Sequence, residues 1–218
     1  MKKITLTIDG DQISIDEGAT ILEAARTVGI EIPTLCHSPD FKPTGNCRIC
    51  VVEVEGARTL VGACHTPVSA GMVVKTDSAK VSMARKATIE LLMAAHTGEC
   101  VTDEHTGACT LRKLADQLES GSPRFLMRRP RWYPVEATNP YVLRDMSKCI
   151  LCRKCISACN EIAGKYVYGL AYRGFATKVV VDCDDALKTD ACRDCGICVD
   201  YCPTGALSKP KTAEGEKI

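Results

Sequence analysis

The stretch CILCRKCISAC (residues 149–159) is followed later by CRDCGICVDYCP (residues 192–203), and both stretches have the same cysteine spacing. In each, three cysteines recur at every third position, and a fourth cysteine lies four residues further on. Closely spaced thiolates are soft ligands that select iron–sulfur clusters or zinc. Because zinc sites usually combine two separated pairs of ligands, three cysteines so close together favour an iron–sulfur cluster.

Most of the other cysteines also occur in groups. Cys47 and Cys50 form a close pair, which is flanked by Cys36 and Cys64. Cys183 lies outside every group, and we expect it to be a free, buried thiol. The chain has 15 cysteines in 218 residues, and this odd number and regular spacing argue against a secreted scaffold held by disulfides.

The composition argues against two classes of partner. The net charge is only +1, so the sequence predicts no basic surface for nucleic acid or for an anionic membrane. It contains no run of about 18 apolar residues, the length that a membrane span needs. Residues 1–5 lead into a strand pattern rather than into the apolar segment of a signal peptide, so we expect a cytoplasmic protein.

The N-terminal residues predict a β-hairpin followed by a helix. Ile4, Leu6 and Ile8 alternate with polar residues, a turn is expected at Gly10–Asp11, and the alternation then resumes. Residues 19–28 have helical periodicity and are followed by a glycine. A hairpin that leads into a helix suits a β-grasp domain. We also expect strands at 51–54, 73–76 and 178–181, and helices from Asp77 or Ser78 to Ala95 and over 111–118.

The first group of cysteines resembles the ligands of a plant-type [2Fe–2S] ferredoxin, in the longer-loop form of NADH dehydrogenase and hydrogenase subunits. The resemblance implies one [2Fe–2S] cluster, held by Cys36, Cys47, Cys50 and Cys64. Gly45 lies just before Cys47 and would let the backbone approach the inorganic sulfides. His37 and His65 directly follow ligand cysteines, and we interpret them as residues around the ligands or at the surface, not as ligands.

The two later stretches resemble the bacterial two-cluster ferredoxins, in which each run gives three cysteines to its own cluster and the fourth to the other cluster. The resemblance implies two [4Fe–4S] clusters. One would be held by Cys149, Cys152, Cys155 and Cys202, and the other by Cys192, Cys195, Cys198 and Cys159.

The order of these parts resembles one family of iron–sulfur subunits. It is similar to the N-terminal region of the large iron–sulfur subunit of bacterial NADH dehydrogenase, of multimeric iron-only hydrogenases and of NAD-dependent formate dehydrogenases. It is also similar to the small diaphorase subunit of NAD-reducing hydrogenases. The residues RDMSKCILC (144–152) and Asn139–Pro140 carry the likeness, which covers about residues 4–207.

A second site departs from the family pattern. In the family, the motif H-x3-C-x2-C-x5-C holds a [4Fe–4S] cluster with a histidine ligand. Here His96, Cys100 and Cys109 occupy three of these places, and Asp103 stands in the fourth. Four interpretations stay open: Asp103 binds iron as a harder, more labile donor; His105 substitutes for it; the site holds a [3Fe–4S] cluster on three ligands; or no cluster is present.

These features predict an α+β protein of three parts. They are a β-grasp [2Fe–2S] ferredoxin domain, a short helical segment with histidine and cysteine, and a two-[4Fe–4S] bacterial-ferredoxin-like domain. The expected boundaries are 1–78, 79–120 and 141–207, with a linker rich in proline and arginine at 121–140 and a polar tail at 208–218.

We expect this chain to be the electron-transfer subunit of a soluble multisubunit NAD(P)-linked oxidoreductase, without a catalytic site of its own. The resemblance implies a flavoprotein partner that reacts with NAD(P)H, and often a thioredoxin-like [2Fe–2S] subunit. A further partner would be a hydrogenase, a formate dehydrogenase, a bifurcating flavoprotein or soluble ferredoxin. The alternatives are an iron–sulfur redox sensor and a zinc-stabilised interaction protein.

Overall fold

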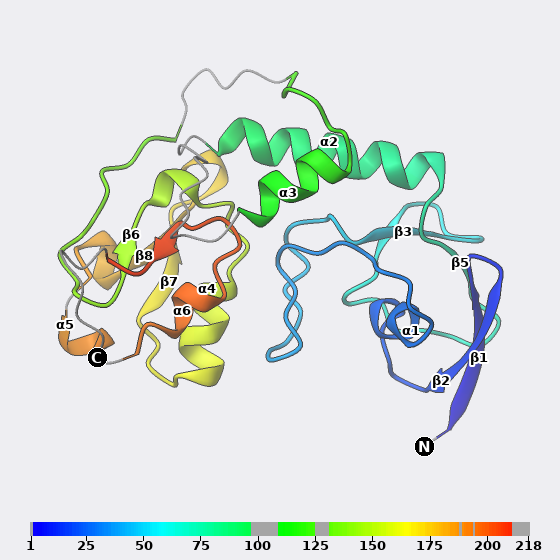
Figure 1. Cartoon of the computed structure of the whole chain (residues 1–218). Helices are drawn as coiled ribbons and strands as arrows, with labels where there is room; N and C mark the ends of the chain where they lie inside the picture. Colours follow the sequence, from blue (N-terminus) through cyan, green and yellow to red (C-terminus); the bar gives the residue numbers. More distant parts are fainter. Residues whose placement is uncertain (1, 97–108, 125–130, 188, 194, 211–218) are drawn as a thin grey trace. The chain divides into compact units, whose positions relative to one another are not determined.

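The computed structural model of the chain describes residues 2–96, 109–124, 131–187, 189–193 and 195–210 (Figure 1). The chain divides into two compact units, each built from three separate segments. Unit 1 consists of Met1–His37, Pro43–Leu92 and Leu114–Phe125, and unit 2 consists of Ser38–Lys42, Met93–Lys113 and Leu126–Ile218. Each unit has its own hydrophobic core.

Unit 1 begins with the expected β-hairpin, formed by β1 (Lys3–Ile8) and β2 (Asp11–Asp16). The turn lies at Asp9–Gly10, one residue earlier than the sequence suggested, because Asp9 and Gly10 both have positive φ, at 51° and 99°. Two such residues form the tight turn whose twist matches that of paired strands. The register pairs Leu6 with Ile13, and both side chains are buried.

The hairpin belongs to a five-stranded sheet with the strand order β2-β1-β5-β3-β4. Strands β1 and β5 (Val73–Lys75) are parallel, whereas the other neighbours, including β3 (Val51–Val54) and β4 (Val61–Gly62), are antiparallel. Helix α1 (Ile21–Thr27) buries Ile21, Leu22, Ala24 and Ala25 in the same core. This arrangement confirms the predicted ferredoxin-type α+β domain.

Helix α2 (Ala79–Ala95) directly follows Ser78, one of the two expected caps. The Ser78 hydroxyl accepts a hydrogen bond from Val81 N at 3.3 Å. Residues Val81, Arg85 and Ile89 recur at four-residue intervals on its buried face. Helix α3 (Thr110–Gln117) buries Leu111 completely. Both helices therefore lie within two residues of the expected ranges.

Unit 2 consists of short elements around the later cysteine stretches. The hairpin of β7 (Tyr168–Ala171) and β8 (Lys178–Val181) lies between the two stretches, and β6 (Leu143–Arg144) pairs with β9 (Leu207–Ser208). Four helices follow or overlap the cysteines: α4 (Lys154–Ser157), η2 (Ala158–Ile162), α5 (Thr189–Cys192) and α6 (Ile197–Asp200). The described part of unit 2 also contains the single turns η1 (Met146–Lys148), η3 (Gly174–Ala176) and η4 (Asp182–Asp184).

Part of the segment that the composition suggested as a linker is packed within unit 2. Tyr133 N donates a hydrogen bond to Ser147 Oγ at 2.8 Å. Glu136 pairs with Arg144 through both backbone bonds and a 2.8 Å ion pair. Proline and arginine content alone did not reveal these contacts, because they depend on residues further along the chain.

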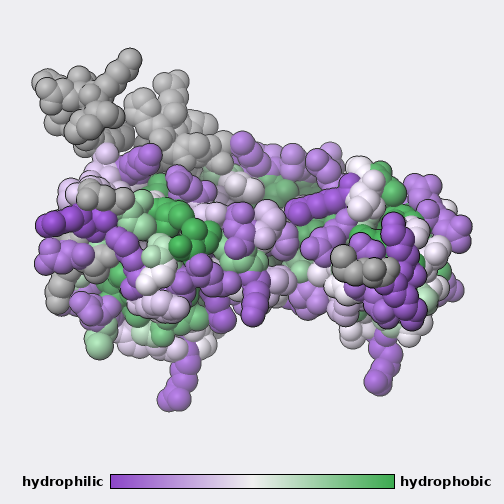
Figure 2. Space-filling view, turned by 90° about the horizontal axis from the view of Figure 1, so that it is seen from below, coloured by the Kyte–Doolittle hydropathy of each residue, from purple (hydrophilic) through white to green (hydrophobic). Residues whose placement is uncertain are grey.

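None of the helices in the described ranges is long and apolar enough to cross a membrane. Figure 2 shows that hydrophilic residues cover much of the face in view, with apolar residues in separate patches.

The first prediction concerns the start of α1. Glu23 N donates to Thr20 Oγ1 at 3.2 Å, and Thr20 N donates to Glu23 Oε2 at 2.7 Å, which is a complete capping box. We expect Thr20→Ala to lower the free energy of unfolding by about 1 kcal/mol. Urea unfolding, followed by the visible absorbance of the clusters, measures this loss. Thr59→Ala is the control, because Thr59 lies exposed in a loop, and an equal loss there would contradict the capping role.

Candidate metal centres

The four cysteines of unit 1 lie in a buried group on the loops around β3 and β4. All are buried, and Cys47 N donates a hydrogen bond to Cys36 Sγ at 3.4 Å. A hydrogen bond from the Cys47 thiol lowers the pKa of Cys36 to about 5, and the same contact raises the pKa of Cys47. A hydrogen bond between the Cys64 and Cys50 thiols likewise lowers the pKa of Cys50 to about 7 and raises the pKa of Cys64.

These opposed shifts describe thiols that ionise one per pair. A second thiolate beside the first is disfavoured by burial and by charge repulsion. All four sulfurs become anionic together only when positive charge lies between them, which the iron of a cluster supplies. The donor set therefore fits a [2Fe–2S] cluster.

The loop before Cys47 supports the same fit. The amide nitrogen Nδ2 of Asn46 is buried and has no hydrogen-bond acceptor among the described residues, which a cluster sulfur would provide. Gly45 and Arg48 both have positive φ, at 65° and 58°. This backbone turns tightly beside the ligand cysteines.

Arg85 places a buried cation beside this group. Its side chain comes from α2, is 6% exposed, and donates from Nη2 to Val51 O at 2.9 Å, directly after Cys50. Burial lowers the pKa of Arg85, an effect that Asp77 and the Cys50 thiolate oppose. The sequence analysis missed this residue, although its place between Val81 and Ile89 on an apolar helix face is a detectable signal.

In unit 2, the structure brings Cys202 to the first cysteine stretch. One cavity is lined by Cys149, Cys152, Cys155 and Cys202, together with apolar side chains such as Met146, Val179 and Leu207. Leu151 N donates to Cys149 Sγ and Leu207 N donates to Cys202 Sγ, each at 3.4 Å. Such N–H···S bonds are a principal means by which proteins stabilise and tune iron–sulfur clusters.

Cys159 lies correspondingly close to the second stretch. Burial raises the pKa of Cys198 to about 12, and the charges of Cys192, Cys159 and Cys195 add to this effect. Val167 N donates to Cys159 Sγ at 3.3 Å. The buried Tyr168 hydroxyl lies 3.7 Å from Cys198 Sγ, a contact that the sequence analysis did not anticipate.

Burial also raises the pKa of Cys149 to about 11 and that of Cys152 to about 12. These thiols are therefore neutral at pH 7 in the metal-free protein. Iron binding would have to displace their protons, so cluster assembly and thiol ionisation would occur together.

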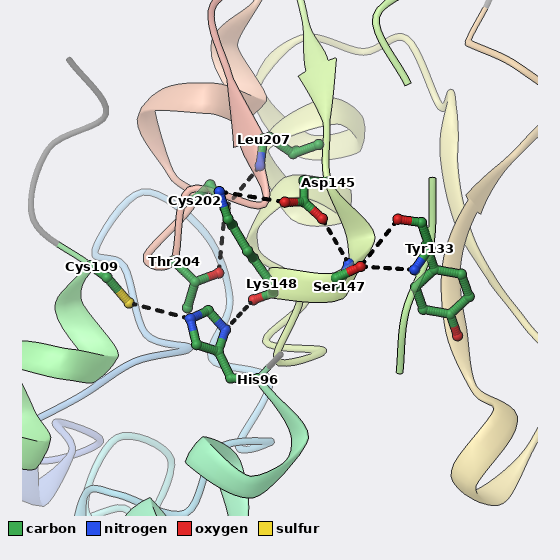
Figure 3. A network of polar contacts seen from close by, with 9 residues as sticks. All are labelled: His96, Cys109, Tyr133, Asp145, Ser147, Lys148, Cys202, Thr204 and Leu207. Atoms are coloured by element: carbon green, nitrogen blue, oxygen red, sulfur yellow. Dashed lines mark hydrogen bonds and ion pairs between the residues drawn. The ribbon is translucent and has the colours of Figure 1, made fainter. Parts of the chain in front are cut away.

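The segment at the end of α2 places His96 in unit 2, next to the residue that precedes Cys149 (Figure 3). His96 Nδ1 lies 2.9 Å from Lys148 O. A carbonyl oxygen only accepts, so Nδ1 carries the proton, and Nε2 faces Cys109 Sγ at 3.9 Å. In this tautomer Nε2 carries no proton and faces the sulfur of Cys109.

The rest of this second site, Cys100, Asp103 and His105, lies outside the described residues. In the described ranges, no three histidine, cysteine, aspartate or glutamate side chains converge on a point that would hold a single metal ion. The ligands of an iron–sulfur cluster bind separate iron atoms and need no such convergence.

The expectation of a buried Cys183 is wrong. Its side chain is exposed, in the turn η4 directly after β8. Asp182, Cys183 and Asp184 all have positive φ, between 45° and 73°. The strand pattern therefore ends before Cys183, which the apolar run before it did not reveal.

Comparison with known proteins gives the family. Residues 1–79 match a 2Fe-2S iron-sulfur cluster binding domain, and residues 139–208 match the ferredoxin-like domain of NADH-quinone oxidoreductase subunit 3. A crystal structure of an NAD+-reducing [NiFe]-hydrogenase in the H2-reduced state contains a similar chain, with a TM-score of 0.78 and 31% identity. The match covers 94% of this chain and 86% of that one. The chain belongs to the family of iron–sulfur subunits shared by NADH-quinone oxidoreductases and NAD(P)-linked hydrogenases.

Two curated members of the family extend the likeness. The chain is 41% identical over 219 residues to the NADP-reducing hydrogenase subunit HndD of Solidesulfovibrio fructosivorans, covering 95% of this chain and 36% of that protein. It is 33% identical over 212 residues to the mitochondrial NADH-ubiquinone oxidoreductase 78 kDa subunit of Candida albicans, covering 96% and 29%. The chain therefore spans about a third of the length of these relatives.

The second prediction concerns Arg85. We expect Arg85→Met to leave Val51 O without its partner and to lower the free energy of unfolding by about 1–3 kcal/mol. Loss of the buried cation should also lower the reduction potential of the nearby cluster, which redox titration measures. The control is Lys80→Met, because Lys80 is an exposed cation on the same helix. If both variants had the same potential as the wild type, a direct electrostatic role of Arg85 would be excluded.

Proposed function

We propose that this chain relays electrons between a flavoprotein that reacts with NAD(P)H and another redox partner. The observation that supports the proposal is that this one chain contains three proposed ligand sets, each of four largely buried cysteines. In unit 2, each proposed set takes one cysteine from the other stretch, which would keep the two clusters close together. Close spacing favours transfer of single electrons from one cluster to the next.

The chemistry of the clusters indicates the redox partner on the NAD(P)H side. An iron–sulfur cluster accepts one electron at a time, whereas a nicotinamide transfers two electrons as hydride. A flavin accepts the hydride and releases its electrons singly. A flavoprotein subunit is therefore the partner that a cluster chain requires on the NAD(P)H side.

The names of the relatives support an assignment to a multisubunit complex, since they include a hydrogenase subunit and a ubiquinone oxidoreductase subunit. We propose that the acceptor side is a hydrogenase, a formate dehydrogenase, a bifurcating flavoprotein or soluble ferredoxin, and that a thioredoxin-like [2Fe–2S] subunit assists the flavoprotein. A cytoplasmic location suits these clusters, because thiols remain reduced there.

We assign one [2Fe–2S] cluster to the set in unit 1 and two [4Fe–4S] clusters to the two sets in unit 2. The ligands are those expected from the resemblance: Cys36, Cys47, Cys50 and Cys64; Cys149, Cys152, Cys155 and Cys202; and Cys192, Cys195, Cys198 and Cys159. We further propose a third cubane at His96, Cys100, Asp103 and Cys109. The supporting observation is the orientation of His96 Nε2 toward Cys109 Sγ.

The third prediction tests the three principal clusters. Protein purified without oxygen should be brown and should contain about ten iron atoms per chain, or about fourteen with the third cubane. After reduction, EPR spectra should show one [2Fe–2S] signal and at least two [4Fe–4S] signals. NAD(P)H should reduce the clusters only when the flavoprotein is added. Colourless protein that contains zinc would reject the proposal in favour of an interaction module.

The fourth prediction tests the third cubane. We expect His96→Ala to lose about four iron atoms per chain, because it removes one ligand. Asp103→Cys should retain the iron and lose it more slowly to a chelator, because a thiolate binds this cluster more firmly than a carboxylate does. His105→Ala is the matched control and should behave as the wild type. Unchanged iron content in His96→Ala would show that no cluster depends on this histidine.

A further inference from the structure

The histidine that follows Cys64 lies directly against a predicted ligand of the [2Fe–2S] cluster. His65 Nδ1 is 3.6 Å from Cys64 Sγ, within the range of a hydrogen bond to sulfur. The His65 side chain is exposed, whereas Cys64 is buried. The imidazole ring therefore lies at the surface of unit 1, in contact with the buried sulfur.

Two glycines make room for this ring. A Cβ atom at Gly62 would lie 2.4 Å from His65 Cε1 and 2.9 Å from Nδ1, both closer than real contacts. The next neighbour, Arg48 Nη1, would be 3.4 Å away, which is an ordinary contact. A Cβ atom at Gly45 would lie 3.2 Å from Nδ1. Gly45 has a positive φ, but Gly62 does not, so the backbone of Gly62 would accept alanine. Among the described neighbours, only the ring of His65 conflicts with a side chain at Gly62.

The backbone around the ring is also held firmly. Gly62 O accepts hydrogen bonds from His65 N at 3.3 Å, from Thr66 N at 3.1 Å and from Thr66 Oγ1 at 2.8 Å. These three bonds fix the turn that leads from β4 to His65. The turn thus holds the backbone of His65 next to Gly62, and the imidazole lies over that glycine.

The chemistry of the contact follows from the state of the sulfur. As a cluster ligand, Cys64 is a thiolate, which can only accept a hydrogen bond. The proton must then be on Nδ1, and the bond is N–H···S. Reduction adds one negative charge to the cluster and its ligands, so this bond is stronger in the reduced state. A bond that is stronger after reduction raises the reduction potential.

We propose that His65 is a positioning residue that raises the reduction potential of the [2Fe–2S] cluster through an N–H···S bond to Cys64, and that Gly62 provides the space for its ring. The proposal rests on the proposed function, because it requires the cluster. Under this proposal, a residue that does not bind iron helps to set the reduction potential of the cluster in unit 1.

The first experiment removes the donor and keeps a ring. In the full-length protein, His65→Phe should reduce the ratio of reduced to oxidised [2Fe–2S] cluster about tenfold at a fixed applied potential, which corresponds to a fall of about 59 mV for one electron. EPR at a temperature where only the [2Fe–2S] signal is observed measures this ratio. His65→Asn should recover most of it, because its Nδ2 offers a donor at the same distance along the side chain.

The matched control is His37→Phe. His37 also follows a ligand cysteine, but it interacts electrostatically with Glu23. The pKa of Glu23 is lowered mainly by a backbone hydrogen bond from Thr20 and, to a smaller extent, by the charge of His37. The potential of this variant should stay at the wild-type value. An equal fall in both variants would show that the loss of any nearby histidine has the same effect, and it would overturn the proposal.

The second experiment keeps His65 and moves its ring. Gly62→Ala should displace the imidazole and lower the potential as His65→Phe does. The double variant should show no further fall, because both changes remove one bond. Gly169→Ala is the control, since a Cβ atom there meets nothing within 4 Å.

The outcomes separate this proposal from the proposed function. A full-intensity [2Fe–2S] signal with unchanged potential in His65→Phe would overturn the role of His65 and leave the electron relay intact. Additive shifts from Gly62→Ala and His65→Phe would also overturn it, because the two changes would then act independently. A wild-type protein without the [2Fe–2S] signal would overturn both proposals.

Discussion

The strongest constraint on this structure is the electrostatic cost of bringing four buried thiolates together. In unit 1, one cysteine of a pair ionises at the expense of the other, as the opposed pKa shifts of Cys36 and Cys47 show. In unit 2, burial is the main reason why the thiol of Cys152 is neutral. Each unit therefore buries thiols, such as Cys47 and Cys152, whose raised pKa keeps them neutral unless positive charge such as that of iron lies beside them. Cluster binding and folding are linked for this reason, since the metal supplies the charge that the protein interior lacks.

The surrounding protein offsets the negative charge on the cysteine sulfurs with hydrogen-bond donors. Backbone N–H groups of Cys47, Leu151, Val167 and Leu207 each donate to a cysteine sulfur. Arg85 contributes a buried positive charge in unit 1. The same contacts hold the sulfurs in place and, with a cluster bound, would stabilise an added electron, so structural support and control of the potential would have one source.

The sequence predicted the parts of this protein that depend on local spacing. The hairpin, α1 and α2 follow from alternation and helical period, and the cysteine intervals gave the sets of candidate ligands. Arg85, Tyr168 and the space that Gly62 leaves for His65 depend on which segments meet in the fold, and no local pattern encodes that. Cys183 was misjudged for a related reason: an apolar strand precedes it, but residues with positive φ turn its side chain to solvent.

At the second site, where Asp103 stands in the place of a family cysteine, the structure adds the orientation of His96 to what the motif indicates. Asp145 Oδ1 accepts a hydrogen bond from Ser147 N at 3.1 Å (Figure 3). The backbone oxygen of Asp145 accepts from Lys148 N at 3.1 Å, so η1 holds the Lys148 carbonyl in place. That carbonyl fixes the proton of His96 on Nδ1. At the proposed third site, Nε2 would thus face a metal without a proton, and the turn η1 just before Cys149 sets this tautomer. Because His96 is buried, its tautomer is set by this carbonyl and not by solvent, so the direction of Nε2 is a property of the fold.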